Sequence, residues 1–376
     1  MANGLNILVI NWQDITNPDG GGAEVHLHEI FKRVAAKGHR VTLLCCSYPG
    51  AEQEETLDGI RIVRKGSRGL FNFFVPFMYN KLRKEIPIDV VVDDINKIPF
   101  YTPLYVKEPI LALEHHLFGK SIFMQAPLIP AAYVYYSEKL VPVVYRHTPF
   151  AVVSESTRQE LLGDGVLAEI SMLYNAVDHD DYLHDERLRS TTPLVGYFGR
   201  LKKYKCVEHF IRAIPAVIES VPDANFVIMG GGDDSPRLEQ LVNQLGIANR
   251  VTFTGYVSDR DKVEWLNRMW FAVNPSPKEG WGLTVIEANA CGTPVIAADS
   301  PGLRDSVVDG ETGILYPFGQ INILEEKMIF LLQNEKIRNK LSKNSLNWAL
   351  EFNWDESANQ AVRIMESCKK NRNGEL

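Results

Sequence analysis

Short apolar runs alternate with helical patterns along the first half of the chain. Residues 6–11 form an unbroken apolar run, which is typical of a strand buried on both faces of a sheet. Residues 24–39 repeat apolar positions at helical spacing, and Gly38 suits the position just after a helix end. This alternation predicts a parallel sheet with helices on both faces. The further strands expected here are 41–46, 88–94, 109–115 and 150–156, the last of which leads into a helix over 156–165.

A second alternating series follows a short break in the pattern. Periodicity stops and charge rises over residues 176–190, which we interpret as a linker. We expect Pro215 to bend or split the helix over 207–222, and Ser258 to cap a helix over 259–269. Apart from the strand at its start, the chain beyond residue 293 is expected to be helical. The strands expected in this half are 194–200, 225–232, 250–257, 270–276 and 294–299.

The two series predict two α/β domains, residues 1–175 and 191–350, followed by a terminal helical segment, 351–376. A ligand crevice is expected at the carboxyl ends of the strands, between the domains. A length of 376 residues with 45% hydrophobic content is enough for two hydrophobic cores. The formal charge of −7 gives no indication of nucleic-acid binding.

The cysteines, the N-terminus and the apolar stretches indicate the cellular compartment that we expect for the protein. The five cysteines show no zinc-binding spacing, which favours reduced thiols in a cytoplasmic protein. The N-terminus has no basic region or cleavage site of a signal peptide. The apolar stretch nearest to the roughly 18 residues of a membrane-spanning helix is 122–136, which two prolines interrupt.

A glycine run stands between the first strand and the first helix. Gly20, Gly21 and Gly22 would let the backbone approach a ligand, and a helix N-terminus attracts anions. A flexible surface turn is the alternative. The P-loop and GxGxxG patterns are absent, and the second strand ends in Cys45-Cys46 instead of an acid, which disfavours a dinucleotide dehydrogenase.

Two cations follow the first strand of the second series. Arg200 and Lys205 suit a diphosphate, because arginine grips oxygens bidentately and lysine adds a point charge. A solvated basic turn is the alternative for this segment.

Two glutamates stand eight positions apart near the end of the second series. Prolines and glycines forbid a helix before about residue 283, so Glu279 lies on a loop and Glu287 inside the following helix. Each carboxylate can accept hydrogen bonds from sugar hydroxyls, while the N–H groups of 281–284 face phosphates. The spacing therefore suits one long ligand with a diphosphate between two hydroxyl-bearing ends.

Glu279 and the stretch after it, GWGLTVIEANACGTPVIA, resemble the signature of the family 4 glycosyltransferases, which have the GT-B fold. The resemblance extends over nearly the whole chain. Further matches are GRL-x3-Lys205, GGGAE, Asn175-Ala-Val-Asp178, GETGILY over 310–316 and FNWDESA near the end.

The resemblance implies two Rossmann-like α/β/α domains facing a central cleft, with the C-terminal helix crossing back to the first domain. It implies retaining transfer of a sugar from a UDP- or GDP-sugar to a hydroxyl of a glycan or lipid-linked acceptor, with no further cofactor and no metal. Two alternatives are a sugar-nucleotide epimerase of the same fold and a non-catalytic sugar-nucleotide binding protein.

The resemblance also assigns roles to individual residues. Arg200 and Lys205 would stabilise the leaving diphosphate, Glu279 would contact the donor sugar and Glu287 the ribose. His115 would lie near the transferred sugar; a core-facing histidine is the alternative. Cys206 and Trp281 depart from the family pattern, which more often has glycine and phenylalanine there. The remaining positions expected to bind the donor are Gly21, Gly22, Gly280, Gly282, Leu283 and Thr284.

Residues 61–84 carry seven Lys or Arg, five interleaved aromatics and no acid. This composition favours peripheral contact with an anionic membrane on its cytoplasmic face, where a lipid-linked acceptor would lie. The alternative is an ordinary basic helix whose aromatics face the core.

Overall fold

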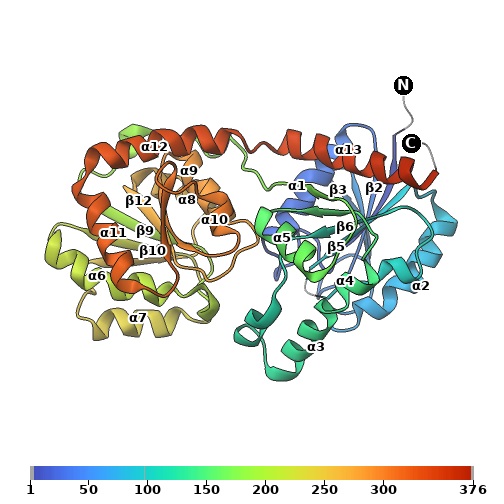
Figure 1. The fold of residues 1–376 in the computed structure, drawn as a ribbon, viewed down its shortest axis with the longest axis horizontal. Coiled ribbons are helices and arrows are strands. Elements are labelled where there is room, and N and C mark those ends of the chain that lie inside the picture. The colour runs from blue at the N-terminus through green and yellow to red at the C-terminus, as the bar shows by residue number, and fades with distance from the viewer. Residues whose placement is uncertain (1–3, 97, 374–376) are drawn as a thin grey trace. The chain divides into compact units, whose positions relative to one another are not determined.

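The computed structural model describes residues 4–96 and 98–373. The chain divides into two compact units, residues 1–175 with 354–376 and residues 176–353. Each unit has one sheet covered by helices (Figure 1).

The first unit has an eight-stranded sheet in the order β3-β4-β2-β1-β5-β6-β7-β8. Every neighbouring pair is parallel except β3 and β4, which are antiparallel. The parallel sheet predicted from the apolar runs is thus confirmed, while β3, β4 and β8 had not been predicted because they are short or polar. The strands are β1 (Asn6–Ile10), β2 (Arg40–Cys45), β3 (Glu54–Leu57), β4 (Ile60–Arg64), β5 (Val90–Ile95), β6 (Ile110–Glu114), β7 (Phe150–Val152) and β8 (Ile170–Met172).

Helices of the first unit include the last helix of the chain. This helix, α13, packs against α1 and reaches β5 and β6. Two ion pairs hold α13 against the rest of the first unit. They join Arg33 to Asp355 at 3.4 Å and Lys369 to Asp89 at 2.7 Å. The helices are α1 (Gly22–Ala36), α2 (Phe71–Glu85), α3 (Leu128–Glu138), α4 (Val141–Val144), α5 (Glu155–Asp164), α13 (Trp354–Asn373) and the 3-10 turns η1 (Thr102–Leu104) and η2 (Gly119–Met124).

The second unit has a six-stranded parallel sheet in the order β11-β10-β9-β12-β13-β14. The expectation that the chain is helical beyond β13 is wrong at β14. Its register with β13 buries Ile314 and Tyr316, which gives this segment the burial that favours a strand. The strands are β9 (Leu194–Phe198), β10 (Asn225–Met229), β11 (Val251–Gly255), β12 (Phe271–Asn274), β13 (Val295–Asp299) and β14 (Gly313–Pro317).

The helices of the second unit follow the predicted alternation. Helix α6 runs without interruption through Pro215, so the proline does not split it. Ser258 caps α8 as predicted, because its hydroxyl accepts the Asp261 N–H at 3.2 Å. The helices are α6 (Val207–Ser220), α7 (Ser235–Gln244), α8 (Asp259–Arg268), α9 (Leu283–Ala290), α10 (Leu303–Ser306), α11 (Ile321–Gln333), α12 (Glu335–Leu350) and the 3-10 turns η3 (Glu186–Leu188) and η4 (Lys203–Lys205).

The segment interpreted as a linker, 176–190, packs on the second unit. His184 Nδ1 lies 3.0 Å from the Cys291 carbonyl oxygen, and the Asp185 N–H donates to the Asn267 side chain at 2.7 Å. Polar side chains that looked solvated in the sequence therefore hold this segment against α8 and α9.

Residues 61–84 do not form one helix. They begin in β4, where Arg64 is fully buried, and continue into α2, where Phe71 and Tyr79 belong to the core. Phe73 and Phe77 are instead 72% and 67% exposed. The expectation of one basic and aromatic surface is therefore wrong for part of this segment and holds for the outer face of α2.

Candidate active site

The central candidate contact joins the loop after β9 to the loop after β12. Lys205 Nζ lies 2.5 Å from Oε1 of Glu279, and the two side chains are 13% and 16% exposed. β9 and β12 are neighbours in the sheet, and the chain order reverses between them. Ligands of open α/β sheets bind at the carboxyl ends of strands at such a switch point.

Close packing of backbones fixes the Glu279 loop. The Glu279 N–H donates to the Pro301 carbonyl at 3.0 Å, and a Cβ on Gly302 would come within 2.2 Å of the Glu279 oxygen. Gly282 has φ +90°, a conformation that favours glycine, and it ends this loop where α9 begins. Glu279 is therefore presented by a constrained loop, and Lys205 reaches it from the turn η4 after β9.

The predicted donor-binding positions around α9 have different exposures. Trp281 and Gly282 are buried, whereas Gly280, Leu283 and Thr284 are partly exposed. The first N–H groups of a helix have no partner within the helix, which makes this end of α9 able to bind an anion.

Arg200 lies on the same β9 loop as Lys205. Its side chain is exposed and forms no ion pair within the part of the chain that the structure describes. The loop packs on the glycine run after β10, since Leu201 N–H donates to the Gly231 carbonyl at 2.9 Å and a Cβ on Gly232 would come within 1.9 Å of the Leu201 oxygen. The guanidinium is thus free to meet a ligand while its backbone is held.

Glu287 is oriented by two side chains that the sequence analysis missed. Lys262 Nζ donates to Oε1 of Glu287 at 2.9 Å, and the Tyr182 hydroxyl donates to the same oxygen. Burial disfavours the charge of Lys262, but the Glu287 carboxylate outweighs it and raises the pKa of Lys262. Oε2 of Glu287 accepts no hydrogen bond from the residues described. No sequence spacing links positions 182, 262 and 287.

The two departures from the family pattern have distinct structural consequences. Cys206 has φ +52°, the left-handed conformation in which a glycine costs least. Trp281 is buried with its ring edge-on to Phe352 at 5.1 Å, so its bulk packs inside the second unit.

Potential metal ligands gather next to this loop. One ligand atom each of Cys206, Glu208 and His209 lies within 4.8 Å of the others. Glu208 also pairs with Arg237 at 3.0 Å.

In the first unit, the predicted glycines lie at the start of α1. The Gly21 N–H donates to Oε2 of Glu24 at 2.7 Å, and Asn96 donates to Oε1 of the same carboxylate at 3.1 Å. A Cβ on Gly22 would meet nothing within 4 Å, so packing within the chain does not require a glycine there. The spacing of Glu24 three residues after Gly21 matches the acidic half of a capping box and could have been recognised in the sequence, although glycine has no side chain to supply the other half.

His115 follows β6, which is separated from β1 by β5 in the sheet. Its Nε2 lies 3.0 Å from Oδ1 of Asp94, and the His26 ring meets it edge-on at 5.1 Å. Burial disfavours the imidazolium, but Asp94 outweighs it and raises the pKa of His115. His26, buried beside His115, has its pKa lowered. Asp93, which precedes Asp94 in β5, has a structural role, because it accepts hydrogen bonds from Thr102 and Tyr145.

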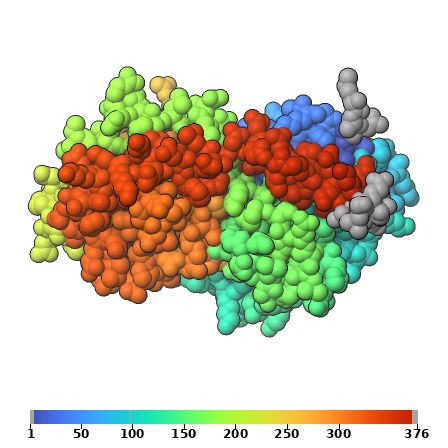
Figure 2. Space-filling model, turned by 45° about the horizontal axis from the view of Figure 1, so that its top comes forward, coloured from blue at the N-terminus to red at the C-terminus, as the bar shows by residue number. Residues whose placement is uncertain are grey.

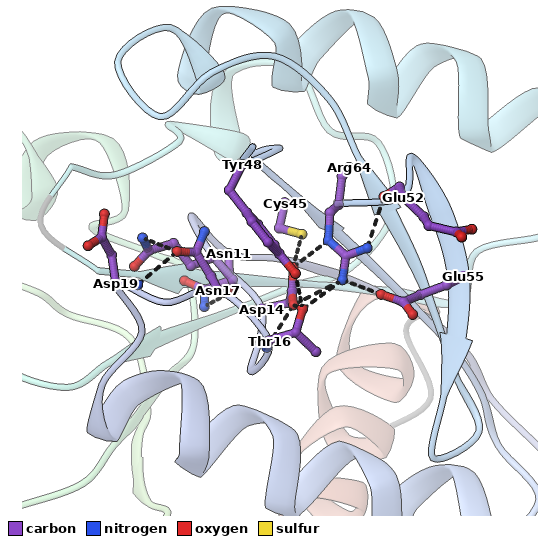
Figure 3. Close-up of polar contacts among 11 residues, drawn as sticks. Asn11, Asp14, Thr16, Asn17, Asp19, Cys45, Tyr48, Glu52, Glu55 and Arg64 are labelled. Atoms are coloured by element: carbon purple, nitrogen blue, oxygen red, sulfur yellow. Dashed lines mark hydrogen bonds and ion pairs between the residues drawn. The ribbon is translucent and has the colours of Figure 1, made fainter. Parts of the chain in front are cut away.

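A buried ion pair holds the loop between β1 and the glycines (Figure 3). Arg64 Nε donates to Oδ2 of Asp14 at 2.7 Å and Nη2 donates to Oδ1 at 3.0 Å, and both side chains are fully buried. Nη2 also donates to Thr16 and to Glu55, at 3.0 and 2.5 Å. The loop that leads to Gly21 is therefore anchored to β4.

Two family models match this chain. The family model "Glycosyl transferases group 1" matches residues 178–348, and the model "Glycosyltransferase Family 4" matches residues 20–181. A phosphatidyl-myo-inositol mannosyltransferase of Mycobacterium leprae is 26% identical over 374 residues, which cover 92% of this chain and 93% of the relative.

Solved structures share the fold. Sucrose-phosphate synthase from Thermosynechococcus elongatus has a TM-score of 0.81 at 21% identity, over 96% of this chain and 98% of the other. Anabaena HepE, solved in complex with UDP and glucose, has a TM-score of 0.76 at 19% identity, over 96% and 100%. The chain belongs to the family 4 glycosyltransferases and has the two-domain GT-B fold.

Proposed function

We propose that this glycosyltransferase moves a sugar, with retention of configuration, from a UDP- or GDP-sugar to a hydroxyl of a glycan or lipid-linked acceptor. The Lys205–Glu279 pair is the observation that carries the proposal. A cation and a carboxylate 2.5 Å apart, on two neighbouring loops beside the N-terminus of α9, suit a phosphate and the sugar attached to it.

Each side chain then has a distinct task. Lys205 and Arg200 bind the diphosphate and stabilise the negative charge that develops on it as the glycosidic bond breaks. Glu279 accepts hydrogen bonds from hydroxyls of the transferred sugar. Glu287, held at Oε1 by Lys262, accepts the ribose hydroxyls at Oε2. The N–H groups of Leu283 and Thr284 face the phosphates.

We assign the acceptor side of the reaction to the first unit. Gly21 and Gly22 would lie close to the phosphates and the acceptor, and the His115 side chain would lie near the transferred sugar. The name of the mycobacterial relative states a lipid acceptor, and the HepE structure holds UDP and glucose, which supports this substrate class. We place the enzyme at the cytoplasmic face of a membrane, in peripheral contact with it.

The test is release of nucleoside diphosphate by the full chain from a panel of UDP- and GDP-hexoses. Lys205→Ala and Glu279→Ala should each lower turnover at least about a hundredfold, the size of a lost electrostatic contact with the transition state. Lys203→Ala, on an exposed lysine of the same turn, is the matched control and should keep wild-type turnover.

Other outcomes would identify the alternatives. Conversion of the donor into an isomer with no nucleoside diphosphate released would indicate an epimerase. A raised melting temperature with no turnover would indicate a binding protein. Wild-type turnover in both site variants would refute the site. The anomeric configuration of the product, read by NMR, tests retention.

A further inference from the structure

Helix α3 and the turn η2 before it expose apolar side chains that a water-facing helix would not. Leu128 and Ile129, at the start of α3, are 74% and 83% exposed, and Met124 and Tyr136 are also exposed. The opposite face is apolar too, because Ala131 and Val134 pack in a small core with Phe118 and Ile122. An amphipathic surface helix has a polar outer face, and this one does not.

Helix α2 adds to the same surface. The Asn72 side chain donates to the Tyr133 hydroxyl at 3.1 Å, which places the start of α2 beside α3. Phe73 and Phe77, one helical turn apart, are exposed on α2. In Figure 2 the teal atoms of this region project beyond the green atoms of the same unit. We call Met124, Leu128, Ile129, Tyr136, Phe73 and Phe77 the apolar surface.

More than half of the exposed large apolar side chains that the structure describes lie between residues 70 and 143. A concentration of this kind marks an interaction site, since scattered exposed residues need no explanation. None of the helices described is both long and apolar enough to cross a bilayer.

The segments that carry the apolar surface contain lysines and few acids. Residues 61–84 contain no acid, and the only acid between residues 115 and 154 is Glu138. Glu138 is buried and accepts the N–H groups of Phe118 and Gly119 at 2.6 and 2.8 Å. Lys65, Lys84 and Lys120 are exposed and form no ion pair within the described part of the chain. Anionic lipid headgroups match this combination.

We propose that the apolar surface docks on an anionic bilayer, with Leu128 and Ile129 among the acyl chains and the lysines at the headgroups. This proposal deepens the proposed function, on whose lipid-linked acceptor it rests, and moves the contact from 61–84 as a whole to η2, α3 and the outer face of α2. A second copy of the chain would bring the same positive charges together, which disfavours self-association.

The experiment is flotation of the full chain with vesicles of phosphatidylcholine, alone or with about 30% phosphatidylglycerol, at about 0.15 M salt. The wild type should bind the anionic vesicles and not the neutral ones. Ile129→Glu should lower the bound fraction on the order of tenfold, since a charge is strongly disfavoured among acyl chains. Leu350→Glu, at an exposed leucine of the second unit, is the matched control and should bind like the wild type.

Three results would overturn the proposal. Recovery of the wild type in the unbound fraction with anionic vesicles is one, and equal binding by Ile129→Glu is another. The third is a wild-type dimer that Ile129→Glu converts to a monomer, measured by light scattering, because the surface would then join two copies.

Nucleoside diphosphate release without vesicles separates this proposal from the proposed function. Ile129 has no part in donor binding, so Ile129→Glu should keep the wild-type release rate. A wild type that floats but releases nothing would refute the transferase assignment and leave the docking surface standing. A wild type that releases nucleoside diphosphate but does not float would refute the docking surface and leave the transferase assignment standing.

Discussion

Replacing Arg64 with methionine removes the cation that holds the loop between β1 and Gly21. The guanidinium is fully buried and donates to the Asp14 carboxylate, Thr16, Glu55 and the Glu52 carbonyl. Methionine keeps much of the volume, so the main loss is electrostatic. Asp14 would remain buried without a cation, and breaking a buried pair in this way destabilises by about 3–5 kcal/mol.

This loss is a large fraction of the about 5–15 kcal/mol that stabilises a typical domain. It should also depend on pH. Arg64 keeps the pKa of Asp14 below its usual value despite burial, so the pair stabilises the fold above the unfolded-state pKa of Asp14 and is lost as pH falls through the folded value. In Arg64→Met, burial raises the pKa of Asp14, so the protonated form becomes favoured in the fold. The stability difference between wild type and variant should therefore shrink on acidification toward about pH 4.

The assay is urea unfolding of both proteins at two pH values, with hydrogen–deuterium exchange of residues 11–22 to localise the effect to the first unit. Asp14→Asn combined with Arg64→Met is the control, because the double variant leaves no fully buried charge unpaired and should recover part of the lost stability. A loss of stability below about 1 kcal/mol, or one that is the same at both pH values, would refute this reasoning. The Arg64–Asp14 pair would then contribute no more than an exposed ion pair does.

Three smaller perturbations test other features of the structure. Cys206→Gly should be more stable than Cys206→Ala by about 1 kcal/mol in urea unfolding, because alanine is strained at φ +52°; equal stabilities would contradict this. Ser258→Ala should destabilise by about 1 kcal/mol through loss of the cap on α8, measured in the same way, and no change would mean that the cap contributes nothing. Asp94→Asn should lower the pKa of His115, as followed by NMR of the imidazole. Because the wild-type pKa is raised, the wild type should exceed Asp94→Asn in stability most below about pH 6.5 and lose this advantage as pH rises through the folded pKa.

Much of the fold was accessible from the sequence because it depends on local pattern. Unbroken apolar runs such as 6–11 are what a strand buried on both faces requires, and Ser258 with Asp261 is a local capping signal. The proximity of Lys205 and Glu279 also follows, since both come directly after parallel strands, whose carboxyl ends meet at one edge of the sheet.

The missed features depend on contacts far apart in the chain. Arg64 and Asp14 are fifty positions apart, and a buried arginine in β4 looks the same in the sequence as an exposed one. The partner of Glu287, Lys262, lies on another helix, and the 25 positions between them match no local pattern that would indicate a contact. Likewise, the apolar residues of 122–136 look like core in the sequence, and only the folded chain shows which of them are exposed.

The most direct test of the site is the affinity of the full chain for UDP and GDP, measured by calorimetry with wild type and Lys205→Met. We predict that one of the two nucleotides binds and that Lys205→Met weakens its binding at least about tenfold, or about 1.4 kcal/mol. The exposed-lysine control Lys203→Met should bind like the wild type. Failure of both nucleotides to bind, or undiminished affinity in Lys205→Met, would contradict the assignment of this turn to the donor diphosphate.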